Sequence, residues 1–529
     1  MRQHRTPRLL GTLLLVAAAG ISVVGAAPTA AAKTAAPLGQ VVPAPASVHP
    51  GGSAYRITGD TRIRVDDSPG ARRVGEYLAD ILRPSTGYRL PVTSHGGGAG
   101  IQLRLGAKGL GGEAYRLDSG RGGVTITAAK PAGLFHGVQT LRQLLPAAVE
   151  KNSVQPGPWL VAGGTIEDSP RYGYRGAMLD VSRHFFSVGQ VKRYIDELAL
   201  YKVNKLHLHL SDDQGWRIAI DSWPRLAAYG GSTQVGGGTG GSYTKADYQE
   251  IVRYAASRYL EVVPEIDMPG HTNAALASYA QLNCDGVAPP LYTGTDVGFS
   301  SLCVAKPVTY DFVDDVIREL AAITPGRYLH IGGDEAHSTS HADYVTFMDK
   351  VQPIVAKYGK TVVGWHQLTG ATPAKGAIAQ YWGLDDTSAE EKAQVAKAAR
   401  NGTGLVLSPA DRVYLDMKYT ADTPLGQDWA GLVEVKRAYD WDPGTYLPGA
   451  PSSAIRGVEA PLWTETIVTG ADIDYMAFPR LPGVAELGWS PASTHDWDTY
   501  KVRLAAQGPR WDALGIGYYK SPQVPWPAA

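Results

Sequence analysis

The chain has few cysteines, no excess of charge of either sign and few long apolar runs. Its 529 residues include 50 Lys and Arg against 50 Asp and Glu, so the formal net charge at pH 7 is zero. A neutral chain is a poor partner for nucleic acid or an anionic membrane surface, and we expect neither. Charged residues make up only 19% of the chain, against ~25% in typical soluble proteins, while Gly is abundant. This composition is typical of a loop-rich soluble enzyme.

The one long apolar run lies at the N-terminus, where it suggests an export signal. Three arginines precede the run from Leu9 to Val24, and small residues follow at 25–27 and 30–32. This order is typical of a secretory signal peptide. A membrane anchor is the alternative, but the run is short for a span and is interrupted by Gly and Ser. We therefore predict a signal peptide at 1–32, cleaved from a secreted protein that keeps no membrane attachment.

Only two cysteines occur, Cys284 and Cys303. In an exported chain, two nearby cysteines usually pair. A disulfide between them would close a loop of about 19 residues and stabilise the fold by roughly 3 kcal/mol. Two cysteines so far apart in the sequence are poor candidates for the ligands of a metal site. We predict neither a metal nor a cofactor.

Residues 33–49 are rich in Ala and Pro, which predicts a flexible lead-in. Residues 50–168 combine short strands with two amphipathic helices. Runs that alternate apolar and polar residues predict strands at 62–65, 101–105 and 124–127. Apolar residues three and four positions apart predict helices around 72–82 and 134–145. We predict a small α+β domain, within which no constellation of reactive residues occurs.

Residues 169–529 alternate strands with helices, which implies parallel β–α units. Ser187 with Gln190, and Thr244 with Asp247, have the spacing of helix capping boxes. Eight apolar runs read as strands: 176–181, 205–210, 260–266, 328–331, 361–365, 377–382, 404–407 and 456–463. Eight such units favour a closed (β/α)8 TIM barrel, because an open sheet of that length would leave edges to cover. The predicted fold class is therefore α/β, with the α+β domain ahead of the barrel.

The fourth strand runs into the stretch His330-Ile331-Gly332-Gly333-Asp334-Glu335. Neighbouring side chains on a strand point to opposite faces, so Asp334 and Glu335 can share a site only if the strand has ended. The two glycines let the backbone turn and let a ligand approach closely. Barrel enzymes keep their chemistry at such strand ends. A charged turn that caps the next helix is the alternative that this stretch alone leaves open.

Polar or aromatic residues follow every predicted strand end. In chain order they are Arg183-His184, Asp212-Asp213, Glu265 to His271, Asp334-Glu335, Trp365, Trp382, Tyr414 with Asp416, and Trp463-Thr464-Glu465. A lone Trp is usually a core residue, but eight such ends in succession are hard to explain as packing alone. Indole rings stack on apolar faces and carboxylates grip hydroxyl groups. A mouth of this kind, without a basic patch, fits a neutral sugar.

Four motifs carry a resemblance to a known family: residues 179–185 (LDVSRHF), 207–214 (HLHLSDDQ), 265–271 (EIDMPGH) and 330–335 (HIGGDE). On these motifs the chain resembles the glycoside hydrolase family 20 β-N-acetylhexosaminidases of the exported bacterial type. The resemblance extends from about residue 40 to the end. It implies removal of terminal N-acetylglucosamine or N-acetylgalactosamine from oligosaccharides such as chitooligosaccharides. It also implies a retaining, substrate-assisted mechanism in place of the usual two-carboxylate scheme.

The resemblance implies roles for eleven of the residues at the strand ends. Glu335 would be the general acid and then the base, while the 2-acetamido carbonyl of the sugar attacks the anomeric carbon. Asp334, as a carboxylate beside a neutral Glu335, would accept the acetamido N–H, and Tyr414 would donate to its carbonyl. Further residues would bind the sugar or tune the acid: Trp365, Trp382 and Trp463 as walls, Arg183, Asp416 and Glu465 on ring hydroxyls, and Asp212 and His271 beside Glu335.

Two other functions are open at this point. A metal-dependent deacetylase on the same barrel could use His207 and His209 with His330, His337 and His341. Metal ligands converge at a strand end with an open position, whereas His207 and His209 precede the strand end and are expected inside the barrel. A sugar-binding protein without turnover is the second alternative, although a lectin has no need of two adjacent acids. Neither the oligomeric state nor the configuration of the sugar follows from the sequence.

Overall fold

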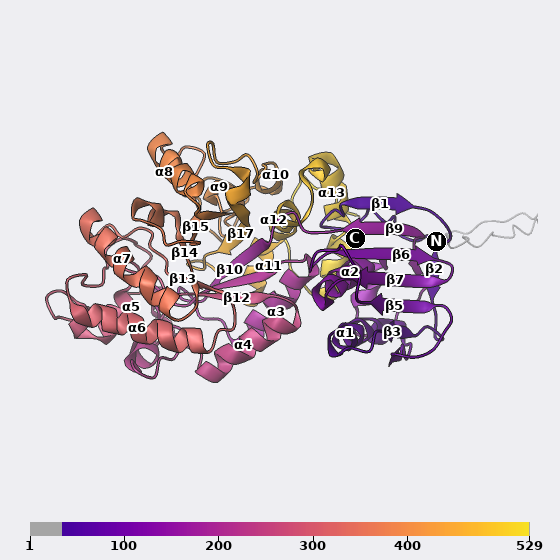
Figure 1. The fold of residues 1–529 in the computed structure, drawn as a ribbon, viewed down its shortest axis with the longest axis horizontal. Coiled ribbons are helices and arrows are strands. Elements are labelled where there is room, and N and C mark those ends of the chain that lie inside the picture. The colour runs from indigo at the N-terminus through magenta and orange to yellow at the C-terminus, as the bar shows by residue number, and fades with distance from the viewer. Residues whose placement is uncertain (1–33, 528–529) are drawn as a thin grey trace, which may run out of the picture. The chain divides into compact units, whose positions relative to one another are not determined.

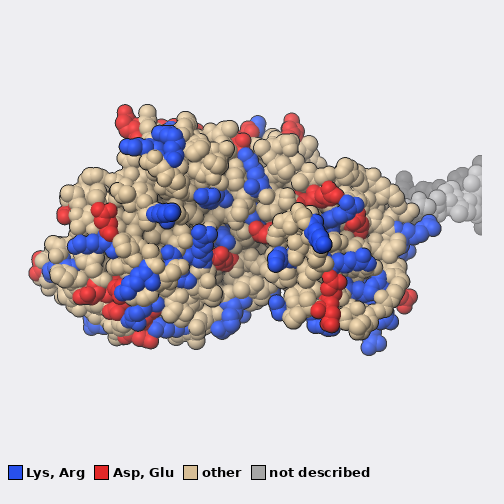
Figure 2. Space-filling view, viewed as in Figure 1, with Lys and Arg blue, Asp and Glu red and all other residues tan. Residues whose placement is uncertain are grey.

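The computed structural model describes residues 34–527, so the signal peptide predicted at 1–32 lies outside the described residues. None of the helices in that described range is both long enough and apolar enough to cross a membrane. On the face shown in Figure 2, Lys and Arg residues are interspersed with Asp and Glu residues, in keeping with the balanced composition.

The first domain is a seven-stranded sheet with two helices packed against it (Figure 1). The strands follow the order β1 (Ser47–Pro50), β9 (Gly164–Asp168), β6 (Tyr115–Gly120), β7 (Gly123–Ala128), β5 (Gly100–Arg104), β3 (Ile63–Val65) and β4 (Val92–Thr93). A separate two-stranded sheet joins β2 (Tyr55–Ile57) to β8 (Trp159–Val161). The helices are α1 (Pro69–Thr86) and α2 (Pro131–Leu144). The predicted α+β architecture is confirmed.

Local signals at its ends make α1 longer than its predicted range. The hydroxyl of Ser68 accepts a hydrogen bond from the Ala71 N–H, and Pro69 occupies the first turn. Gly87 ends the helix in the left-handed conformation, with φ of 71°. In α2, Gly137 allows close packing on β7, because a Cβ at this position would lie 2.5 Å from the side chain of Ile126.

The described part of the predicted flexible lead-in packs on the protein. Leu38, Val41 and Val42 are buried, and the N–H of Val42 donates to the side chain of Gln143 at 2.9 Å. Residues from Ser47 onward form β1 and pair with β9. The prediction of flexibility was wrong for these residues, because it weighed the Ala and Pro content and overlooked the three apolar side chains that the domain buries.

Eight parallel strands form a closed barrel, as predicted. They are β10 (Tyr174–Asp180), β11 (Lys205–His209), β12 (Glu261–Glu265), β13 (Tyr328–His330), β14 (Thr361–Trp365), β15 (Ile378–Tyr381), β16 (Gly404–Leu407) and β17 (Ile455–Leu462). Strand β10 pairs with both β11 and β17, which closes the ring. Because all eight strands run in the same direction, their carboxyl ends meet at one mouth of the barrel.

Helices surround these strands (Figure 1). They are α3 (Val188–Leu200), α4 (Lys245–Ser257), α5 (Asn273–Ser278), α6 (Pro307–Ala322), α7 (His341–Lys357), α8 (Ala389–Arg400), α9 (Ala410–Val413), α10 (Val435–Tyr439), α11 (Gly470–Ala477), α12 (Arg480–Trp489), α13 (Trp497–Ala505) and α14 (Gly508–Leu514). The predicted capping boxes open α3 and α4.

A buried carboxylate joins the first domain to the barrel. Asp168, at the end of β9, accepts hydrogen bonds from Tyr115 at 2.7 Å, Lys202 at 3.0 Å and the Trp489 indole at 3.0 Å. Because Asp168 and Lys202 are both buried, each depends on the other to balance its charge. This contact ties the sheet of the first domain to the bottom of the barrel.

Candidate active site

The ends of the barrel strands enclose a cavity of about 200 Å³. Its lining residues are Arg183, His271, Thr295, Val297, Asp334, Glu335, Trp382, Tyr414, Asp416, Gln427, Trp429, Trp463 and Glu465. All the residues predicted for the site line this cavity except Trp365 and Asp212, which lie one layer behind it. A larger hollow of about 1030 Å³ lies beside α1 and α3, where arginines and carboxylates mostly pair with each other. The smaller cavity therefore has the stronger claim to chemistry.

The turn after β13 brings both acids of the Asp334–Glu335 pair into the cavity. Gly332 and Gly333 have positive φ values of 65° and 98°, and Glu335 itself lies in the left-handed region at 44°. A Cβ on Gly332 would lie 1.7 Å from a carboxylate oxygen of Asp267, which accepts the Gly333 N–H at 3.0 Å. A glycine is thus required here. A non-glycine residue held at positive φ is a form of strain that clusters at functional sites.

One imidazole contacts both acids. The Nε2 atom of His271 lies 3.2 Å from a carboxylate oxygen of Glu335 and 3.6 Å from one of Asp334. Its Nδ1 atom lies 3.2 Å from the carboxylate of Asp212, which also contacts Arg183 at 3.1 Å. Asp334 and Glu335 therefore face a common site. Asp212 orients the imidazole from behind.

The pKa values of the two acids shift in opposite directions. Burial raises the pKa of Asp334 to about 6, with the charge of Glu335 adding to the rise and that of His271 opposing it. Burial also acts to raise the pKa of Glu335, but the hydrogen bond and charge of His271 outweigh it and lower that pKa. In this structure the imidazole of His271 therefore favours the ionised form of Glu335. The neutral Glu335 beside a charged Asp334 that the reaction requires stays a prediction.

Aromatic rings form one wall of the cavity. Trp382, Tyr414 and Trp463 line it directly. Trp365 is fully buried, packs on Trp463 with ring centres 5.7 Å apart, and donates its indole N–H to Glu265 at 2.9 Å. It supports the wall from behind, because it is the last residue of β14 and its ring turns into the barrel. A tight apolar pocket of this kind suits a small acyl group.

Several buried polar atoms in the cavity have no hydrogen-bond partner among the described residues. They include the Arg183 Nε, one carboxylate oxygen each of Asp334 and Asp416, and one of Glu465. Buried polar atoms are nearly always paired in folded proteins. Burial, together with the charge of Glu465, also raises the pKa of Asp416 well above its usual range. The cavity is therefore prepared for a ligand that carries several hydroxyl or amide groups.

Comparison with known proteins fits this arrangement. The model of the glycosyl hydrolase family 20 catalytic domain matches residues 172–492, and that of domain 2 of the same family matches residues 39–169. The chain belongs to glycosyl hydrolase family 20. The family 20 assignment extends over both the barrel and the domain ahead of it.

Family 20 relatives resemble the chain over nearly its whole length. A β-N-acetylhexosaminidase of Cellulomonas fimi is 43% identical over 90% of this chain and 95% of its own. The solved family 20 β-N-acetylhexosaminidase of Streptomyces coelicolor A3(2) is 79% identical, with a TM-score of 0.93 over 94% of this chain and 100% of that chain. A mutant β-hexosaminidase of Streptomyces plicatus, solved with its product GlcNAc, is 78% identical with a TM-score of 0.93 over 93% and 99%. The chain is thus a β-N-acetylhexosaminidase of family 20.

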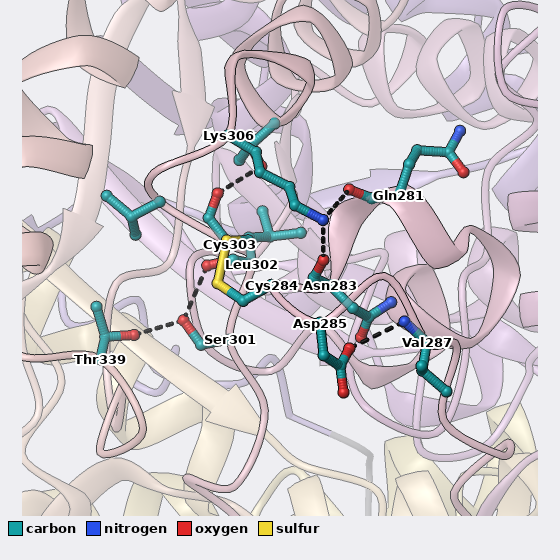
Figure 3. The surroundings of a disulfide bond; sticks show 12 residues. Gln281, Asn283, Cys284, Asp285, Val287, Ser301, Leu302, Cys303, Lys306 and Thr339 are labelled. Atoms are coloured by element: carbon teal, nitrogen blue, oxygen red, sulfur yellow. Dashed lines mark hydrogen bonds between the residues drawn. A yellow bond between two sulfur atoms is a disulfide. The ribbon is translucent and has the colours of Figure 1, made fainter.

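Loop residues that the sequence did not single out complete the family 20 cavity: Thr295, Val297, Gln427 and Trp429. Thr295 and Val297 belong to the loop that the disulfide between Cys284 and Cys303 closes. Figure 3 shows this disulfide beside Lys306, whose ammonium donates to the Asn283 carbonyl, and beside Ser301, whose hydroxyl bonds that of Thr339 at 2.6 Å. The spacing of the cysteines was the available signal that this loop is held in place.

Two histidines of the metal-dependent alternative, His207 and His209, lie inside the barrel. Both ring nitrogens of His207 contact carboxylates, Glu459 at 2.7 Å and Glu265 at 2.8 Å. Both nitrogens of His209 do the same, with Glu265 at 2.5 Å and Asp212 at 2.6 Å. No ring nitrogen of this pair faces the cavity. The interior position predicted for them is confirmed.

Proposed function

We propose that this family 20 enzyme is secreted and exo-acting. Its substrates would be oligosaccharides with a terminal non-reducing N-acetylglucosamine or N-acetylgalactosamine, such as chitooligosaccharides, and its mechanism retaining and substrate-assisted. The observation that carries the mechanism is that Asp334 and Glu335 both contact the imidazole of His271, in a cavity lined by indole rings. The small cavity, which Asp416 and Glu465 line, suits a single sugar ring and supports exo-action. The GlcNAc bound to the Streptomyces plicatus enzyme supports the class of sugar.

The reaction divides into two steps between the sugar and three side chains. Glu335 protonates the glycosidic oxygen as the acetamido oxygen attacks the anomeric carbon, so the bond to the leaving group breaks and an oxazolinium ion forms. Asp334 accepts the acetamido N–H and balances the charge that develops on nitrogen. Tyr414 donates to the acetamido oxygen, and its burial raises its pKa well above the usual value, so its proton is retained. Water then opens the ring, with Glu335 as its base.

The sizes of the expected rate effects favour the substrate-assisted mechanism. An internal nucleophile held in position is worth an effective concentration of ~10⁵–10⁸ M, so no enzyme nucleophile is needed. A positioned general acid adds a factor of ~10²–10⁴. The two contributions together are comparable to the rate enhancements of typical enzymes.

Binding of the sugar would itself set the protonation states. The side chain of Glu335 is 28% exposed, so a sugar ring over it would bury it further and raise its pKa. The acetamido N–H, donated to Asp334, would favour the ionised form of that acid. The substrate would thus reverse the order of the two pKa values in the structure. An acid that gains its proton as the substrate binds is ready to transfer it.

Hydrolysis of paired aryl glycosides tests the mechanism. The 2-acetamido-2-deoxy glycoside should be hydrolysed and the matching 2-hydroxy glucoside should not, because only the first brings a nucleophile. Equal rates on the two would refute the substrate-assisted reaction. The variant Glu335→Gln should bind N-acetylglucosamine without turnover of the phenyl glycoside. A wild type that binds the sugar and never releases product would instead be a lectin, and activity lost to a strong chelator would favour a metal-dependent hydrolase.

Secretion is tested separately. The enzyme should accumulate in the culture medium, with an N-terminus near residue 33 by sequencing of the mature protein. Full-length protein retained in the cell pellet would contradict it.

A further inference from the structure

A chain of alternating carboxylates and imidazoles runs through the barrel beneath the cavity. In order it comprises Glu459, His207, Glu265, His209, Asp212 and His271. Successive contacts measure 2.7, 2.8, 2.5, 2.6 and 3.2 Å. Every member is buried. None of its members takes part in the two reaction steps described above, although the last, His271, contacts both acids.

The contacts fix the charge of each imidazole in this chain. His207 and His209 each lie between two carboxylates, so both ring nitrogens must donate, and this requires the charged imidazolium. Burial acts to lower the pKa of both groups, but the carboxylates outweigh it: the pKa of His207 rises to about 9 and that of His209 rises well above its usual value. Negative and positive charges therefore alternate along the whole chain.

The two ends of the chain differ. At the far end, the carboxylate of Glu459 accepts hydrogen bonds from the Tyr174 hydroxyl and the Gln380 amide, each at 2.7 Å. At the near end the Nε2 atom of His271 is directed at Asp334 and Glu335. Burying so many charges is expensive, and apolar side chains of similar volume would fill a barrel as stably or more so. A chain that is closed at one end and aimed at the reacting acids at the other has a use beyond packing.

We propose that His209 is a positioning residue for the general acid, acting through Asp212 and His271. This inference rests on the proposed function, in which Glu335 is that acid. One carboxylate oxygen of Asp212 contacts both His209 and Arg183, and the other contacts His271. The charge on His209 keeps Asp212 ionised and its carboxylate plane fixed. A fixed Asp212 holds the imidazole of His271 in the orientation that reaches Glu335.

The groups around His209 determine the effect of removing its charge. Glu265 and Asp267 face it from the end of β12, Asp212 from the turn after β11, and the Trp463 ring from the end of β17 at 4.9 Å. The other cations nearby, Arg183, His207 and His271, reach His209 only through the carboxylates of Asp212 and Glu265. Loss of the imidazolium would therefore leave a surplus of negative charge. A surplus of negative charge raises the pKa of nearby carboxyl groups, Glu335 included.

The variant His209→Gln tests this with two leaving groups. Phenyl N-acetylglucosaminide requires protonation of its leaving oxygen, whereas the 2,4-dinitrophenyl analogue requires almost none. A displaced acid should lower kcat about 10–100-fold on the phenyl substrate, with at most about a threefold loss on the dinitrophenyl substrate. The basic limb of the kcat profile should move to higher pH. Equal losses on both substrates, or an unmoved profile, would overturn the proposal.

His136→Gln is the matched control. His136 is also buried and also contacts a carboxylate, Glu113 at 3.1 Å, but it lies in the first domain outside the chain of charges. Its substitution should leave the leaving-group dependence unchanged. If His136→Gln gave the same pattern as His209→Gln, the effect would be general loss of structure and the proposal would fail.

A measurement on the wild type covers the case in which His209→Gln does not fold. With ¹⁵N-labelled histidine, His209 should show two ring protons throughout pH 6–8, assigned through its contact with the Trp463 indole. A neutral His209 in that range would overturn the inference. The outcome for the proposed function is distinct, because a wild type inactive on 2-acetamido glycosides would refute that function whatever the state of His209.

Discussion

Replacing Asp334 by Asn should stabilise the protein at neutral pH while it removes activity. The buried carboxyl has its pKa raised from 3.8 to about 6. A raised pKa means that the folded state binds the proton more tightly than the unfolded chain does. Above pH 6 the folded protein must hold an unfavourable charge, and the difference of about two pKa units corresponds to about 3 kcal/mol. Asparagine carries no charge and escapes this penalty.

The pH dependence gives the sign of the effect. At pH 4 the acid is protonated in the folded state, so Asp334→Asn should leave the free energy of unfolding almost unchanged. The gain should appear between pH 4 and 6 and reach about 3 kcal/mol at pH 8. Urea unfolding of the wild type and the variant at pH 4, 5, 6 and 8 measures this directly. A difference of the same size at pH 4 and pH 8 would refute the reasoning.

Three further outcomes are expected. His271→Gln removes the cation 3.6 Å from Asp334 and should move the acid limb of the kcat/KM profile upward by about one pH unit; an unmoved limb would contradict the role of this imidazole. Lys202→Met leaves the buried Asp168 without the ammonium 3.0 Å away, and should lower the free energy of unfolding in urea by about 3–5 kcal/mol; a loss below about 1 kcal/mol would show that this pair contributes little. Replacing both cysteines by serine should lower that free energy by roughly 3 kcal/mol and raise KM more than it lowers kcat, since the closed loop borders the cavity; an unchanged KM would separate the loop from substrate binding.

Much of the barrel could be predicted because two independent signals coincide at each strand. An apolar run such as 361–365 marks the strand, and the polar or aromatic residue at its end marks the mouth. The predicted ranges lie within about two residues of the strands in the structure. The turn at Gly332 and Gly333 was predictable for a different reason, since two adjacent glycines before two acids have few uses inside a regular strand.

The rest depended on information that spacing does not carry. Thr295 and Trp429 reach the cavity from loops, whose approach is set by tertiary contacts. Trp365 was predicted to wall the pocket although its ring lies behind Trp463, because the direction of a side chain at a strand end changes with a single residue. Asp212 was predicted beside Glu335, and it reaches Glu335 through His271. The order of the two pKa values depends on where His271 lies between the acids, which no sequence pattern states.

The buried charges and unpaired polar atoms of this cavity, which destabilise the fold, have a common explanation. Asp334 holds an unfavourable charge, while Arg183, Asp416 and Glu465 each keep a buried polar atom without a protein partner. Each arrangement lowers the stability of the fold. A sugar with an acetamido group and several hydroxyls supplies all of these hydrogen-bond partners. Binding of that sugar therefore removes the unfavourable contributions to the free energy, and this strengthens its affinity. Glu335 is left partly exposed, because its proton must be exchanged with the leaving group and with water.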